Sequence, residues 1–145
     1  MSTQRSAAEQ ARLIEALGAT AFAVMAVLSK LAAQNDVSLT QVRMIGILHD
    51  HRLTITELSA ALGLDRSSVS GLVDRTEKRG LIRREPNPRD ARSVLVTVSP
   101  AGSEAFAAGA AEVAQELSTM TAALKPAEVN LLVTLLERML AHRVS

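Results

Sequence analysis

Apolar residues recur at helical spacing along most of the chain, which predicts a mainly α-helical protein. We expect a long first helix over about residues 7–34 and a second helix over residues 40–50. A third long helix is expected from Pro100 to about residue 123, because proline is favoured at the first position of a helix. Pro126 begins the last expected helix, whose apolar face holds Leu131, Leu132, Leu135, Leu136, Met139 and Leu140.

Residues 54–98 follow a different pattern, in which two shorter helices precede a hairpin. Thr54 and Glu57 form a capping box that starts the first of these helices, and Gly63 can end it in a left-handed conformation. Asp65 is a good N-cap for the second helix, which closes with a basic turn before a glycine. The expected inner faces hold Ile55, Leu58, Ala61 and Leu62 in the first helix and Val69, Leu72, Val73 and Thr76 in the second.

The hairpin is predicted from turn residues and from alternation. Leu81 and Ile82 begin a short strand, the run from Glu85 to Pro88 breaks it, and residues 94–98 alternate as a return strand. The order of helix, turn, helix and hairpin is that of a helix-turn-helix with a wing, which places its second helix in the major groove of DNA. The predicted fold is therefore mainly α: a winged helix-turn-helix with a two-stranded β wing and long terminal dimerisation helices.

The polar face of the second helix carries the candidate DNA-reading chemistry. Hydroxyl and guanidinium groups suit contacts to base edges and phosphates, although a solvated helix face would look the same on its own. Gly71 would let the helix approach a partner closely, at a cost of about 1 kcal/mol in helix propensity. The candidate recognition residues are Arg66, Ser67, Ser68, Ser70 and Arg75.

Charge is unevenly distributed along the chain, although the whole chain carries only +1. Residues 1–64 hold five basic and five acidic side chains, residues 65–98 hold eight and five, and residues 99–145 hold three and five. The positive excess therefore lies on the second helix and the wing, where DNA phosphates would lie. Because this excess is modest, we expect a dimer that doubles the number of contacts.

Two stretches of the sequence resemble the MarR family of winged-helix regulators. The first runs from Leu64 to Arg75 and continues over residues 77–82, and the second is Asp90-Ala91-Arg92 followed by residues 94–102. The second stretch is similar to the family's wing motif, in which an aspartate, any residue and an arginine precede an apolar strand and a capped helix with a glycine. Because the flanking helices also fit the family plan, the resemblance extends over nearly the whole chain.

The resemblance implies roles for residues at the hairpin tip. The family's wing arginine enters the minor groove and its aspartate helps to orient that arginine, and these positions fall on Arg92 and Asp90. Arg89 is a second candidate for the groove-binding arginine. Thr76 departs from the leucine usual in the family, a difference that could loosen the core beneath the second helix.

The leucine-rich terminal helices have two interpretations: an intramolecular core, or pairing with a second copy of the chain. The family resemblance favours a homodimer, and a two-fold dimer matches palindromic half-sites about one DNA turn apart. We therefore interpret the chain as a single domain. Residues 1–34 and 99–145 form its helical dimerisation region, and residues 38–98 form its winged helix-turn-helix DNA-binding region.

The resemblance also implies a repressor that a small aromatic or phenolic ligand releases from its double-stranded DNA operator. The ligand would lie between the dimer helices and the winged region. Methionine and phenylalanine are adaptable ligand contacts but are more often plain core, and Arg43 could pair with an anionic ligand or with a nearby carboxylate. The candidate pocket residues are Phe22, Met25, Arg43, Met44, Leu48 and Phe106.

Composition argues against other functional classes. The chain has no cysteine, which excludes disulfides, thiolate zinc sites and cysteine-based redox sensing within it. We find no apolar run of about 20 residues and no signal-peptide pattern, and therefore expect a cytoplasmic protein without a membrane partner.

Catalytic patterns are also lacking in the sequence. His49-Asp50-His51 could suggest a metal site, but helix residues two apart point to different faces. Ser68 and Ser70 lack the glycine pattern of a nucleophile elbow, and no glycine-rich phosphate loop is visible. We therefore expect no enzyme activity, no metal and no cofactor. The alternative to a DNA-binding regulator is a winged-helix module that binds another protein.

Overall fold

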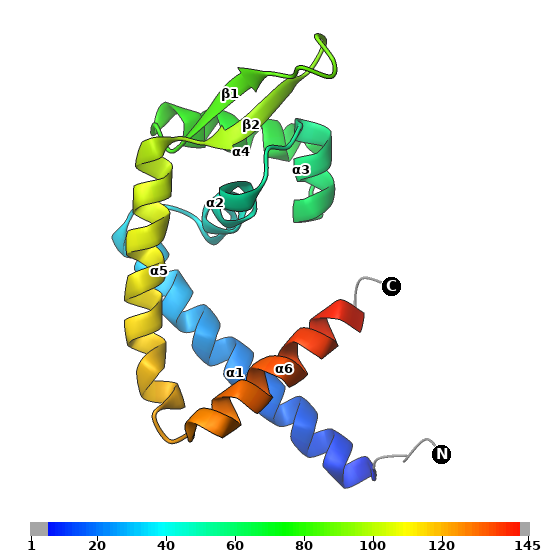
Figure 1. The fold of residues 1–145 in the computed structure, drawn as a ribbon, viewed down its shortest axis with the longest axis vertical. Coiled ribbons are helices and arrows are strands. Elements are labelled where there is room, and N and C mark those ends of the chain that lie inside the picture. Colours follow the sequence, from blue (N-terminus) through cyan, green and yellow to red (C-terminus); the bar gives the residue numbers. More distant parts are fainter. Residues whose placement is uncertain (1–5, 143–145) are drawn as a thin grey trace. The chain divides into compact units, whose positions relative to one another are not determined.

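The computed structural model describes residues 6–142 and confirms a mainly helical winged helix-turn-helix (Figure 1). The chain consists of two compact units, Met1–Val113 and Ala114–Ser145. The elements are α1 (Ala7–Gln34), α2 (Leu39–Asp50), α3 (Ile55–Leu62), α4 (Arg66–Lys78), β1 (Ile82–Pro86), β2 (Val94–Val98), α5 (Pro100–Thr121) and α6 (Pro126–His142).

Local capping explains why the helices begin and end close to the predicted positions. The predicted capping box of Thr54 and Glu57 is present at the start of α3, and Gly63 ends that helix with φ of 68°. Asp65 caps α4 as predicted. The expected third long helix, α5, ends at Thr121, two residues earlier than the expected end.

A single apolar cluster holds α2, α3, α4 and the hairpin together. The predicted stripe of α4 is entirely buried, whereas in α3 the expected inner residue Ala61 is exposed and Ser59 is buried instead. The Ser59 hydroxyl donates a hydrogen bond to the carbonyl of Ile55, so that it is not left unpaired when buried. The buried cluster consists of Met44, Ile45, Leu48, Leu58, Leu62, Val69, Leu72, Val73, Ile82 and Val96.

The wing is an antiparallel pair of strands in which Ile82 faces Val98 and Pro86 faces Val94. The strand ends within the run from Glu85 to Pro88 that was expected to break it, although β1 continues through Pro86 before it does so. β1 pairs with β2 alone, and proline, which has no N–H to donate, is tolerated on an edge strand. On its other side β2 makes an isolated bridge from Val96 to Leu53, which ties the wing to the segment before α3.

The terminal helices expose large apolar side chains. Contrary to the expectation from the sequence, α1 contains an 18-residue window with a mean hydropathy of 1.7 and no more than two charged residues, so that by length and composition alone it could cross a bilayer. Only 11% of that window is buried. Within Ala114–Ser145, the described part of α6 has no buried residue, and its leucines are between 38% and 62% exposed.

Candidate nucleic-acid interface

The start of α4 is fixed by its N-cap. The Asp65 carboxylate accepts hydrogen bonds from the Ser68 backbone N–H at 2.8 Å and from the Ser68 hydroxyl at 2.6 Å. These bonds, the one from the hydroxyl first, lower the pKa of Asp65. The Ser68 hydroxyl hydrogen is therefore already donated within the protein, and its oxygen remains able to accept.

The five candidate recognition residues lie off the buried stripe of α4. Arg66, Ser67, Ser68 and Arg75 are exposed, and Ser70 is half-buried. A Cβ atom added at Gly71 would lie 3.3 Å from the Nη1 atom of Arg75. The missing side chain at Gly71 thus leaves room for the Arg75 guanidinium to lie back along the helix.

Thr76 does not loosen the core, contrary to our expectation. It is fully buried, its hydroxyl donates to the Leu72 carbonyl at 2.7 Å, and it accepts a 3.0 Å bond from the Gln41 side-chain amide. The threonine therefore joins α2 to α4 where a leucine could only make apolar contact. This bond could not be predicted from the sequence, because Gln41 lies 35 residues away in the chain.

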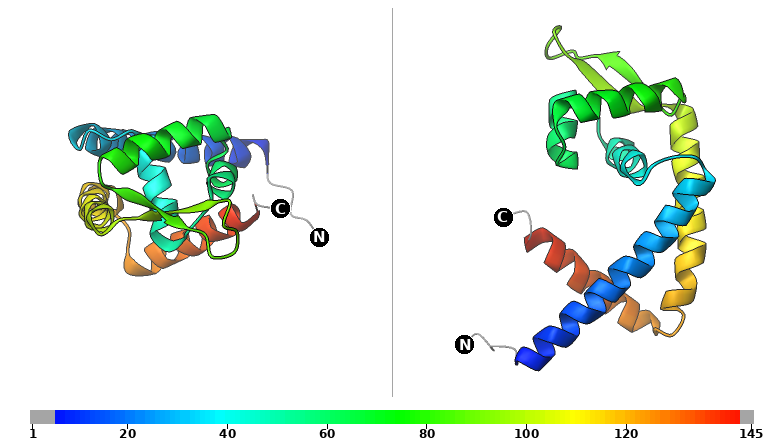
Figure 2. Two further views of the ribbon diagram at one scale, coloured as in Figure 1. Left: turned by 90° about the horizontal axis from the view of Figure 1, so that it is seen from above. Right: turned by 180° about the vertical axis from the view of Figure 1, so that it is seen from behind.

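The tip of the hairpin is held by its own polar side chains and projects away from α4 (Figure 2). The Asn87 amide donates to the Ser93 hydroxyl at 2.8 Å, and the Asp90 carboxylate accepts from the Arg92 backbone N–H at 2.9 Å. Asp90 thereby orders the backbone of Arg92. The Arg89 backbone N–H donates to Asn87 Oδ1 at 3.0 Å. Both candidate arginines therefore belong to a turn that is held by side-chain hydrogen bonds.

Basic residues of this region fall into two groups. Arg79, Arg83 and Arg84 form salt bridges within the protein. Among the described residues, no salt bridge is made by the other five cations of residues 65–98, all of them exposed. This unpaired group consists of Arg66, Arg75, Lys78, Arg89 and Arg92.

Arg84 ties the wing to α4. It contacts the Asp74 carboxylate at 2.6 Å and also pairs with Glu77. The hydrogen bond to Asp74 is the main cause of a raised pKa of Arg84, while partial burial opposes that increase. Because both acidic partners belong to α4, the base of the wing and the candidate reading helix are joined by an ion-pair network as well as by the core.

The six candidate ligand residues are distributed over different environments. Met44 and Leu48 are buried in the core, while Phe22 is 80% exposed and Met25 is 45% exposed on α1. Arg43 is exposed and donates to the Ala61 carbonyl at 3.3 Å. Phe106 is half-buried and stacks on His49, with ring centroids 4.8 Å apart.

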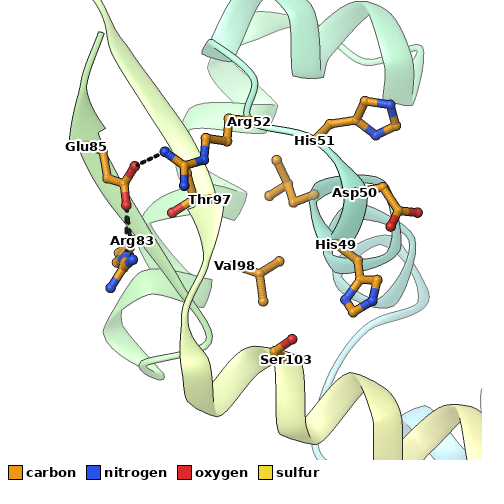
Figure 3. Close-up of a pocket in the computed structure, with 10 residues that line it drawn as sticks. His49, Asp50, His51, Arg52, Arg83, Glu85, Thr97, Val98 and Ser103 are labelled. Carbon is orange, nitrogen blue, oxygen red and sulfur yellow. Dashed lines mark hydrogen bonds and ion pairs between the residues drawn. The ribbon is translucent and has the colours of Figure 1, made fainter. Parts of the chain in front are cut away.

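A cavity of about 260 Å³, which the sequence did not indicate, lies beside the base of the wing (Figure 3). Leu48 is the only one of the six candidate ligand residues among those lining it. His49, Asp50 and His51 also contribute to the lining, yet no group of three potential metal ligands occurs within residues 6–142. The cavity could not be predicted from the sequence, because segments far apart in the chain form it.

Known proteins are similar to this chain in both sequence and fold. The sequence profile of the MarR family matches residues 35–93, which hold α2, α3, α4 and β1. The apo form of wild-type MarR from Escherichia coli is 26% identical, with a TM-score of 0.72 over 90% of this chain and 95% of that one. Over residues 35–93 the chain is similar to the MarR family.

Other comparisons agree with this similarity. The transcriptional regulator YfiV of Bacillus subtilis is 31% identical over 72 residues, covering 49% of this chain and 45% of YfiV. MarR of Salmonella typhimurium is 35% identical over 68 residues, covering 46% and 47% respectively. The matches thus span about half the length of these curated relatives. A MarR-family protein from Bacillus stearothermophilus, only 20% identical, shares the fold, with a TM-score of 0.86 over 98% of this chain and 100% of that one.

Proposed function

We propose that this chain is a MarR-family DNA-binding transcriptional regulator that reads its operator with α4 and with the tip of the wing. The proposal rests on the difference between cations that form salt bridges and cations that do not. Arginines at the base of the wing are neutralised by Asp74, Glu77 and Glu85, whereas the cations on the exposed face of α4 and at the wing tip form no salt bridge among residues 6–142. Unpaired surface cations gathered on a winged helix suit a phosphate backbone.

Within α4 we assign base reading to the N-terminal turns and phosphate binding to Arg75. Residues at the start of a recognition helix reach base edges first. Arg66, Ser67, Ser68 and Ser70 occupy those turns, and their exposure or partial exposure supports this assignment. Because Ser68 donates its hydroxyl hydrogen to Asp65, we propose that it meets DNA as an acceptor.

At the wing we assign the groove-binding role to Arg92, with Arg89 as the second candidate. A guanidinium group suits the negative potential of a narrow minor groove. The bond from the Arg92 backbone to Asp90 supports a role for that aspartate in presenting the arginine. Arg89 has a different neighbour, because its charge contributes, after the hydrogen bonds from Thr54, to the lowered pKa of Glu57 on α3.

We further propose that the protein is a cytoplasmic homodimer, without enzyme activity, that represses from a palindromic operator. Residues 38–98 would bind DNA, and the terminal segments 1–34 and 99–145 would form the dimer. The exposed apolar side chains of α1 and α6 support this proposal, because monomeric proteins seldom expose large contiguous apolar patches. A second copy would cover the same surface of α1 that could otherwise contact a bilayer.

A small aromatic or phenolic ligand is proposed to release the operator. Two proteins of similar fold support this class of ligand: NadR, solved in complex with 4-hydroxyphenylacetate, and BpsR, whose DNA binding is regulated by 6-hydroxynicotinic acid. In this chain Phe22, Met25, Arg43 and Phe106 remain candidates for contacting such a ligand, since each is at least partly exposed. Met44 and Leu48 would act through the core that they fill.

The proposal is tested first by gel shift with random duplex DNA at low salt, followed by selection of the preferred sequence. Arg92→Ala should weaken binding to the selected DNA by about 1–3 kcal/mol without unfolding the protein. Arg12→Ala, which removes an exposed arginine outside residues 38–98, is the matched control. Sedimentation checks that this variant has the same mass as the wild type, and its affinity should then be unchanged. If the wild-type protein fails to shift any duplex, the protein-binding winged-helix module becomes the better interpretation.

A binding matrix then separates the roles within α4. Ser67→Ala or Ser68→Ala should change the preference among single-base operator variants. Arg75→Ala should weaken all sequences alike and lower the salt slope of log K by about one. If the serine variants lose affinity uniformly and Arg75→Ala changes the preferred bases, these two assignments are reversed.

A further inference from the structure

We propose that the cavity beside the base of the wing binds a small organic monocarboxylate. This site is separate from the ligand region implied by the family resemblance, with which it shares only Leu48. Its binding can be tested without DNA, so that the outcome does not depend on the function proposed above.

The cavity is formed within Met1–Val113 by segments that the fold brings together (Figure 3). His49, Asp50 and His51 at the end of α2 form one side, β1 and β2 with the Arg52 side chain form the other, and Ser103 of α5 closes one end. Val98 places apolar surface between these polar walls, and Leu48 adds a second apolar side chain to the lining. The volume of about 260 Å³ is close to the lower limit of ligand pockets in proteins.

Thr97 supplies the observation that points to a missing partner. This residue lines the cavity, is only 5% exposed, and its Oγ1 atom is the one buried side-chain polar atom of the described residues that has no hydrogen-bond partner. Buried polar groups are nearly always hydrogen-bonded, because leaving one unpaired costs stability. In Figure 3 the hydroxyl lies on the same side of the cavity as Arg52 and Glu85.

The charged residues near Thr97 offer more donors than the protein uses. Arg52 and Arg83 share the single carboxylate of Glu85, at 3.3 Å and 3.1 Å. A guanidinium group has five N–H donors, so most of these donors remain available. Glu85 is half-buried, whereas the two arginine side chains are 68% and 55% exposed and can turn toward a ligand. A donor-rich wall of this kind suits an oxyanion.

The remaining lining selects a monocarboxylate among oxyanions. Asp50 and Glu85 balance the two arginines, so the lining has no net charge when the histidines are neutral. A dianion such as phosphate would meet two carboxylates without an excess of cations. Beside the cavity the His49 ring stacks on Phe106, with 31° between the ring planes, and together with Leu48 and Val98 it offers contact to the apolar body of an organic acid.

Benzoate, a flat monocarboxylate, is the probe for this site, and the full-length protein without DNA is the receptor. We expect saturable benzoate binding by calorimetry, with amide chemical-shift changes at Thr97 and Val98. Benzamide, the neutral analogue, and inorganic phosphate should bind at least about tenfold more weakly, the loss expected when a hydrogen-bonded charge is missing or unmatched.

Thr97→Val removes only the unpartnered hydroxyl, so the fold should be retained, and benzoate should bind about tenfold more weakly. Thr56→Val, on the exposed surface of α3, is the matched control and should bind benzoate as the wild type does. Ser103→Ala gives a second test at the α5 end of the cavity and should also weaken binding. Absence of benzoate binding, equal affinity for phosphate, or wild-type affinity in both Thr97→Val and Ser103→Ala would overturn the proposal.

Discussion

Gly102 shows how a single residue fixes the joint between the wing and α5. A Cβ atom at this position would overlap the Leu81 carbonyl oxygen and lie 2.8 Å from the carbonyl carbon, separations that no side chain can occupy. The same joint is tied by Ser99, whose backbone N–H donates to Leu81 at 3.1 Å and whose hydroxyl accepts from the Gly102 N–H at 3.0 Å. Only glycine therefore lets the first turn of α5 lie directly against the chain that enters β1.

Gly102→Ala should accordingly destabilise the fold by about 1–3 kcal/mol or more, because the helix must move away from Leu81. Gly109→Ala in the same helix is the matched control, since nothing lies within 4 Å of the position that its new methyl group would take. That control should gain up to about 1 kcal/mol from helix propensity. Urea denaturation measures both variants. Equal stability of the two would show that the contact at Gly102 relaxes at no cost.

Contacts between residues three positions apart could be predicted from the sequence. Contacts between residues of different helices could not. Thr54 and Asp65 were predicted as caps because their partners lie three residues away. Thr76 was misjudged because its partner Gln41 comes from another helix. Lys125 at the start of α6 is a poor cap, and its backbone N–H is satisfied by the Glu128 side chain at 2.7 Å, again three residues on.

At the scale of elements, helices were predicted more accurately than strands. A helix carries its hydrogen bonds and its caps in its own sequence, whereas the end of a strand depends on the partner strand. β1 therefore runs through Pro86, where the sequence alone indicated a break. The cavity beside the wing could not be predicted for the same reason, since α2, both strands and α5 each contribute a part of it.

Arg79 forms a direct link between α1 and α4. Its guanidinium donates to the Asn35 carbonyl at 3.1 Å and to the Asp36 carbonyl, and it lies 3.8 Å from the Asp36 carboxylate. These carbonyls follow the C-terminal end of α1, where the helix dipole favours a cation. Asp36 itself adopts a left-handed φ of 54°, which turns the chain from α1 toward α2.

Arg79→Ala should therefore lower the free energy of unfolding by about 1 kcal/mol, a small value because the side chain is partly exposed. Amide exchange should also become faster at the end of α1, around residues 33–37. Lys78→Ala is the matched control, because it removes a neighbouring exposed cation from the same end of α4 without a contact to α1. Identical exchange in the two variants would show that Arg79 contributes only its charge.

For the whole molecule, the sequence indicated apolar terminal helices and the structure gives their degree of exposure. The notable difference is α1, whose hydropathy we underestimated because its apolar residues are interspersed with alanine, glycine and threonine rather than gathered in one leucine-rich run. Its Ile14 and Phe22 are 60% and 80% exposed. An exposed apolar surface of this kind suggests a partner that covers it. The partner is either a second copy of the chain or a lipid bilayer, and experiment can distinguish these two.

We expect a homodimer, with a sedimentation mass near twice 15.4 kDa at micromolar concentration in the absence of detergent. Leu131→Glu and Leu140→Glu should shift the protein to monomers, because these side chains are 59% and 62% exposed in one chain and lose little intramolecular packing. Thr134→Glu places the same charge at an exposed polar position of α6 and should remain dimeric. A folded wild-type monomer that co-floats with lipid vesicles would instead identify the bilayer as the partner of α1 and would contradict dimerisation through the terminal helices.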